Sequence, residues 1–121
     1  MKSSSWALCT WMHPIVAIGN ADVWGEEIRE MVRFAWRGYK QVAFGMDEVH
    51  PVSGGGRQFW ALATTLVDAL DTLWLLNLRH EFYEAEAWIT KHLDFSRAMV
   101  GDFFEITIRV LGGLLGAHSV S

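Results

Sequence analysis

Two ionised side chains, Glu105 and Arg109, interrupt the otherwise apolar segment from Phe103 to Leu115. Being four residues apart, they lie one turn apart on one face of a helix, in line with the glycines at positions 112 and 116. Charged groups are rarely placed in an apolar helix unless they are paired or have a function. The spacing by itself favours an ion pair between the two. The alternative is that this charged, glycine-lined face borders a cavity or a partner.

A second apolar segment, from Gln58 to about Asn77, carries Asp68 and Asp71 on a polar face that covers about a third of the helix circumference. Paired carboxylates on either side of a scissile bond are the minimum requirement for glycoside hydrolysis. Buried aspartates also satisfy backbone donors, and that structural role is an equal alternative for these two.

Four helices are expected to position these side chains, and they alternate in kind. Val23 to Phe44 and Arg79 to His92 are amphipathic, whereas Gln58 to Asn77 and Phe103 to the end are apolar nearly all round. Outer helices with one exposed face and inner helices with none explain this alternation, which is typical of a closed α/α barrel. Two inner helices need more cover than two partners provide. The chain is therefore expected to be all-α and to be a piece of a larger domain.

The apolar face expected for the first helix consists of Ile28, Met31, Val32, Ala35, Tyr39 and Val42, and the third helix buries Phe82, Ala85, Ile89 and Leu93. Loops are expected from Gly45 to Arg57 and from Asp94 to Asp102, where glycine, proline and serine accumulate. In the first loop, the polar stretch from Met46 to Pro51 either lines a site or is a solvated connector.

Composition narrows the class of protein. The chain has 121 residues, 51% of them hydrophobic, and a formal net charge of −4. One domain fits this length, and the absence of any basic stripe argues against nucleic acid as a partner. The single cysteine, Cys9, excludes an internal disulfide.

Residues 1–21 are expected to be a leader, either disordered or similar to a signal peptide, because Lys2 precedes a short apolar stretch from Trp6 to Ile18. Such a leader is the only expected contact with a membrane. Phe59 to Leu78 is long enough to cross one, but each aspartate there costs about 2.5–3.5 kcal/mol at the centre of a bilayer.

Four blocks in order carry a resemblance to a known family. They are Phe34 to Lys40 (FAWRGYK), Asp47-Glu48 with Pro51 to Ser53, Thr65 to Trp74 (TLVDALDTLW) and Phe104 to Leu115 (FEITIRVLGGLL). Together they resemble the opening of the class I α-mannosidases, glycoside hydrolase family 47. Residues 22–121 are accordingly expected to form the amino-terminal portion of the catalytic domain.

The resemblance implies an (αα)₇ barrel in the lumen of the endoplasmic reticulum or Golgi, which removes α-1,2-linked mannose from high-mannose N-glycans by a calcium-dependent, inverting reaction. Glu105 matches the proposed general acid, and Arg109 matches the arginine that holds the terminal mannose. Asp68 and Asp71 match acidic positions near the sugar and are expected to bind substrate.

Some features depart from the family pattern. Ile106 stands where family members usually have a polar residue, and His50 stands where a lysine commonly precedes the proline. Only four of the fourteen expected helices are present, and the calcium-binding threonine and the other catalytic carboxylates have no counterpart. No metal ligand is therefore assigned, and the chain alone is expected to be inactive. The alternatives are a mannosidase-like lectin of ER-associated degradation and a non-catalytic helical interaction module.

Overall fold

The computed structural model describes residues 21–97 and 101–121, so the expected leader lies outside the described residues except for its last position. The helices are α1 (Ala21–Ala43), α2 (Thr64–Leu75), α3 (Arg79–His92), the short 3₁₀ helix η1 (Phe95–Arg97), and three consecutive pieces that form one last helix: α4 (Phe103–Glu105), the π-helix η2 (Ile106–Leu111) and α5 (Gly112–Val120). Two-residue strands, β1 (Glu48–Val49) and β2 (Gly56–Arg57), form a small antiparallel hairpin. The expectation of an all-α protein is confirmed.

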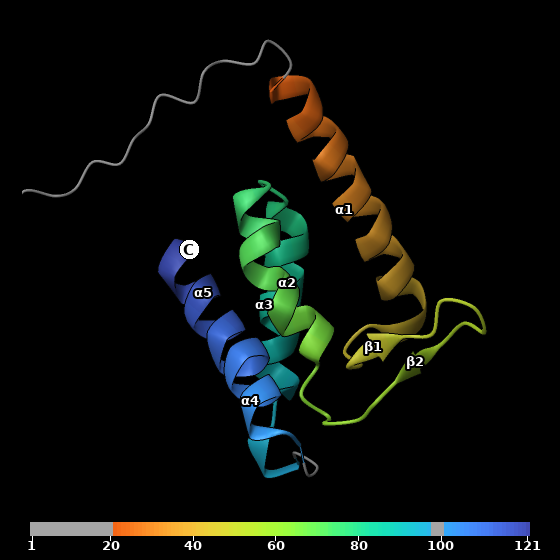
Figure 1. Ribbon diagram of the computed structural model, residues 1–121, viewed down its shortest axis with the longest axis vertical. Coiled ribbons are helices and arrows are strands. Elements are labelled where there is room, and N and C mark those ends of the chain that lie inside the picture. Colours follow the sequence, from red (N-terminus) through yellow and green to blue (C-terminus); the bar gives the residue numbers. More distant parts are fainter. Residues whose placement is uncertain (1–20, 98–100) are drawn as a thin grey trace, which may run out of the picture.

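The core lies around α2, which packs against α3 on one side and against the last helix on another (Figure 1). Leu66, Val67 and Leu73 of α2 have no accessible surface, and Phe82, Ala85 and Ile89 of α3 are buried, as the sequence predicted. In Figure 1, α1 leans away from this group and connects to it near the hairpin. Two large aromatic side chains of α1, Trp36 and Tyr39, fill the space between α1 and the core.

The buried face of α1 differs from the predicted one. Met31 and Ile28 were expected inside, yet they are 69% and 50% exposed, whereas Trp36 and Ala43 are buried together with Tyr39. The helix is rotated so that its largest ring, Trp36, reaches the core, because burying an indole removes more apolar surface from water than burying a methionine or isoleucine side chain. The amino-terminal half of α1 extends beyond the described core.

The second helix begins at Thr64, six residues later than predicted. The preceding residues, from Phe59 to Ala63, form a loop in which Ala61 and Ala63 have positive φ angles of 59° and 51°. This left-handed conformation is unfavourable for alanine and breaks the helix. The prediction failed because the apolar run looked helical, whereas a buried carboxylate, described below, binds the backbone of this loop.

The last helix was predicted to be an inner helix of a larger domain, and in the described residues one of its faces is open. Its apolar side chains on one side are exposed: Phe103, Phe104, Ile108, Leu111 and Leu115. The opposite side packs closely on α2, where a Cβ atom at Gly113 would lie 2.9 Å from the backbone oxygen of Val67. One face is open because, among the described helices, α2 is the one that packs extensively on this helix. By length and composition, Phe103–Val120 is also the one described helix that could cross a membrane, a test that core helices pass too.

Relief of the backbone strain at Ala61 should stabilise the chain. Substitution Ala61→Gly is expected to raise the free energy of unfolding by about 0.5–1 kcal/mol, because glycine adopts positive φ without a steric penalty. Chemical denaturation of the 121-residue chain measures this change. The matched control is Ala69→Gly in the middle of α2, which should lower stability by about 1 kcal/mol. Equal destabilisation by both substitutions would contradict the strained geometry at Ala61.

Candidate active site

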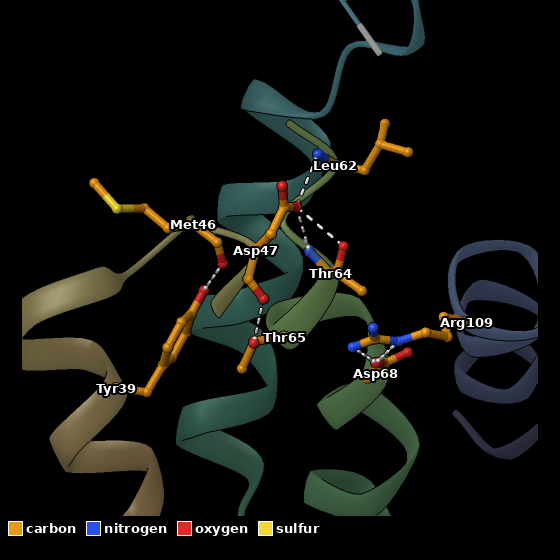
Figure 2. Close-up of polar contacts among 8 residues, drawn as sticks. All are labelled: Tyr39, Met46, Asp47, Leu62, Thr64, Thr65, Asp68 and Arg109. Carbon is orange, nitrogen blue, oxygen red and sulfur yellow. Dashed lines mark hydrogen bonds and ion pairs between the residues drawn. The ribbon is translucent and has the colours of Figure 1, made fainter. Parts of the chain in front are cut away.

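The side chain of Asp47 is the organising centre of the loops next to the candidate site. It has no accessible surface. Its Oδ2 atom accepts hydrogen bonds from the backbone N–H groups of Phe59, Trp60 and Ala61, each at 2.8 Å. Its Oδ1 atom accepts from the N–H groups of Leu62 and Thr64, both at 3.1 Å, and from the Thr64 hydroxyl at 3.0 Å (Figure 2). One carboxylate thus satisfies five backbone donors.

These bonds decide the charge state of Asp47. Burial by itself would raise the pKa of Asp47, but the N–H groups that point at the carboxylate, led by those of Trp60 and Phe59, together lower the pKa below its usual value. The backbone oxygen of Asp47 also accepts bonds from the hydroxyl of Thr65 at 2.6 Å and from its N–H group at 3.2 Å. Asp47 therefore holds the loop and the first turn of α2 from a distant point in the chain.

Tyr39 fixes the other end of this loop. Its hydroxyl donates to the backbone oxygen of Met46 at 2.8 Å (Figure 2). The same hydroxyl accepts from the N–H of Gly45 at 3.0 Å. Burial raises the pKa of Tyr39 to about 12, and the nearby charge of Asp47 acts in the same direction. Gly45 has φ of +83°, and a Cβ atom there would lie 2.2 Å from the Trp88 ring. The polar stretch from Met46 to Pro51 is therefore not simply a solvated connector. Its residues Met46 and Asp47 form hydrogen bonds that hold neighbouring segments, and Asp47 is buried.

Arg109 binds Asp68, not Glu105. Its Nε atom lies 2.8 Å and its Nη2 atom 2.7 Å from Oδ2 of Asp68, and each of the two side chains is 34% exposed (Figure 2). The prediction of an ion pair between Glu105 and Arg109, which the spacing favoured, is therefore wrong. The physical reason is the π-helix η2, which starts directly after Glu105. The wider winding of a π-helix changes the direction in which each following side chain leaves the helix. Arg109 is turned toward α2.

The charged, glycine-lined face that the sequence predicted is only partly in contact with α2. Gly112 is exposed, whereas Gly116 lies against α2, where a Cβ atom would be 3.3 Å from Oδ2 of Asp71. Asp71 itself is half-buried, and its Oδ1 atom accepts a bond from the N–H of Thr72 at 2.6 Å. The structure therefore brings Asp68, Asp71 and Arg109 together along the contact between α2 and the last helix.

Glu105 lies at the end of α4, just before the π-helix, and its side chain is half-buried. Its backbone N–H is capped by Oδ1 of Asp102 at 3.0 Å. Within residues 21–97 and 101–121, the carboxylate of Glu105 forms no hydrogen bond or ion pair. It is thus a carboxyl group held at a rigid helix start, with its oxygen atoms available to a ligand.

The family resemblance implies calcium, whose ligands would have to come from oxygen-bearing side chains. No group of three or more His, Cys, Asp or Glu residues in the described part of the chain could hold a metal ion. These residues therefore do not fit a calcium site, and no chemical step is derived through the ion.

Sequence reasoning missed the importance of Asp47 and Trp60. The indole of Trp60 lies near Arg109, with 5.7 Å between its ring centre and the Cζ atom of the arginine. A signal for Asp47 existed in the residues from Phe59 to Ala63, directly before α2, because none of them has a side chain that can cap the helix. An unassigned acidic residue in the preceding loop was a candidate for that task.

Removal of the Asp47 charge should destabilise the chain strongly. Asp47→Asn keeps the shape of the side chain but turns one acceptor into a donor that faces N–H groups. We expect the free energy of unfolding to fall by about 2–4 kcal/mol. Urea denaturation measures the loss, and the exposed neighbour substitution Glu48→Gln is the control, with an expected change within about 0.5 kcal/mol. Similar small effects for both would contradict the anchoring role.

The stability should also depend on pH through Asp47. Since its pKa is lowered from 3.8 in the folded chain, its contribution is fully present above about pH 4 and disappears as the pH falls through the lowered folded value. Urea midpoints between about pH 2 and pH 6 should therefore decrease toward acid in the wild-type chain. In the Asp47→Asn variant this part of the dependence should be missing. Parallel pH curves for the two proteins would be incompatible with the lowered pKa.

Comparison with known proteins identifies the family to which the chain belongs. Residues 31–121, well over half of the chain, match glycosyl hydrolase family 47. The endoplasmic reticulum mannosyl-oligosaccharide 1,2-alpha-mannosidases of Rattus norvegicus and Homo sapiens are 48% and 49% identical over 87 residues, which cover 72% of this chain and 13% and 12% of the relatives. Mannosyl-oligosaccharide 1,2-alpha-mannosidase IA of Sus scrofa is 41% identical over 99 residues, 78% of this chain and 15% of that protein. The chain thus spans between an eighth and a sixth of the length of these curated relatives. It belongs to glycosyl hydrolase family 47.

Proposed function

We propose that this chain is part of a 1,2-α-mannosidase that removes terminal mannose from high-mannose N-glycans. The observation that carries the proposal is the ion pair between Arg109 on the last helix and Asp68 on α2. Directly before the π-helix that orients Arg109 lies the carboxylate of Glu105, which has no partner among the described residues. The names of the relatives support the substrate class, since they act on mannosyl-oligosaccharides.

Each side chain has a role in this proposal. Glu105 is the general acid that protonates the departing glycosidic oxygen, directly or through a water molecule. Arg109 donates hydrogen bonds to the hydroxyl groups of the terminal mannose, while Asp68 holds its guanidinium in place. Asp71 accepts hydrogen bonds from the same sugar. An inverting reaction also needs a base about 6.5–9.5 Å from the acid, and neither Asp68 nor Asp71 is assigned to it.

The surroundings of the site follow from the family. We propose that the chain forms the first four helices of an (αα)₇ barrel in the lumen of the secretory pathway, in the endoplasmic reticulum or Golgi. The exposed apolar faces of α1 and the last helix support this arrangement, since further helices would cover them. Calcium would be bound by parts of the barrel beyond these helices.

A chimera tests the role of Glu105. Residues 31–121 replace the matching segment of the human endoplasmic reticulum relative, and release of mannose from a high-mannose glycan is measured. We expect activity in the chimera and a loss of at least about 100-fold in kcat for Glu105→Gln, because the amide cannot donate the acidic proton. Glu86→Gln, an exposed substitution on α3, is the matched control and should leave the rate unchanged.

The 121-residue chain without the graft should hydrolyse nothing, because the supporting shell of a complete site is missing. Mannose release by this chain, abolished in Glu105→Gln, would contradict that expectation. A chimera that binds the glycan but never releases mannose would instead favour a mannosidase-like lectin. A folded chimera with full activity in Glu105→Gln would overturn the assignment of the acid.

A further inference from the structure

Trp60 connects the loop bound by Asp47 to the last helix. Its ring centre is 5.7 Å from the Cζ atom of Arg109, within the range of an attractive cation–π contact. On the side of the last helix, the backbone of Gly101 approaches the indole so closely that a Cβ atom there would lie 2.8 Å from Nε1 and 2.9 Å from Cδ1. The indole is therefore enclosed between Arg109 and Gly101.

The backbone of Trp60 is fixed independently of its ring. The N–H groups of Phe59, Trp60 and Ala61 all point at one oxygen atom, Oδ2 of Asp47, at 2.8 Å each. Three successive bonds to a buried carboxylate fix the peptide planes on both sides of Trp60. The direction in which its side chain leaves the backbone is set by Asp47.

The guanidinium of Arg109 is consequently held from two directions. Oδ2 of Asp68 binds its Nε and Nη2 atoms, which fixes the edge of the group. The nearby indole of Trp60 restricts rotation out of that plane. Its Nη1 atom forms no hydrogen bond with the residues that the structure describes, so its donors remain available for a ligand.

We infer that Trp60, oriented by Asp47, is a positioning residue for Arg109. The carboxylate of Asp47 is buried at one end of α2 and fixes the backbone of Trp60. The indole of Trp60 then packs near Arg109, so that the guanidinium holds its Nη1 donors in one orientation. The importance of this orientation for sugar binding rests on the function proposed above. The physical link between the three residues does not depend on it.

The test follows hydrogen exchange at Nε–H of Arg109 by nitrogen-15 NMR in the 121-residue chain, with no substrate present. In Trp60→Leu, the exchange rate of this proton should rise about two- to tenfold, as expected for the loss of a half-exposed cation–π contact. Trp60→Phe should restore most of the protection, because it supplies an aromatic face. The matched control is Tyr83→Leu, which removes an exposed aromatic ring of α3 that packs on Trp74 and Phe82. It should leave Arg109 unchanged.

A second variant covers the case in which Trp60→Leu does not fold. Gly101→Ala does not change the residues that bind Asp47, and it places a methyl group against both the indole of Trp60 and the Cδ1 atom of Ile106, at 2.8 Å and 2.6 Å. It should displace Trp60 and accelerate exchange at Arg109 in the same way. Unchanged exchange at Arg109 in a folded Trp60→Leu or Gly101→Ala variant would overturn the inference. Equal acceleration in Tyr83→Leu would do so too, because it would reflect general loosening of the fold. Neither outcome bears on the acid role of Glu105.

Discussion

A single buried carboxylate, that of Asp47, determines how the described helices are connected. Placing an ionised group where no water reaches it is costly unless hydrogen bonds replace the lost hydration. Five backbone N–H groups and one hydroxyl do so here. The same bonds satisfy donors at the start of α2, whose N-cap position, Ala63, has no side chain for the purpose. The hydrogen bonds that stabilise the buried charge of Asp47 are thus the same bonds that cap the start of α2.

The position of α2 then fixes the side chains that face the last helix. Glycine at position 113 allows the two helices to approach until their backbones nearly touch, and Gly116 lies against Asp71. The π-helix between Glu105 and Gly112 rotates Arg109 onto Asp68 across this contact. Consequently the carboxylate of Glu105 has no partner among residues 21–97 and 101–121, whereas a pairing within its own helix would have neutralised it.

The described structure leaves large apolar side chains exposed on the open sides of α1 and the last helix. Side chains such as Phe103, 85% exposed, and Met31, 69% exposed, are unusual on the outside of a self-sufficient bundle. They agree with membership of a family whose curated relatives are several times longer than this chain. The contact between α2 and the last helix is, by contrast, closely packed within the described residues.

The sequence by itself determined that the chain is helical, which face α3 buries, and which family it belongs to. Those properties depend on local periodicity and on short blocks of residues, such as the one around Glu105. Only the tertiary structure decided where α2 begins, which face of α1 is buried, and which partner Arg109 binds. Asp47 acts on residues 12 to 18 positions away, and Arg109 binds a residue 41 positions away. Helical periodicity records neighbours within a few positions, so contacts of this range are not visible in it.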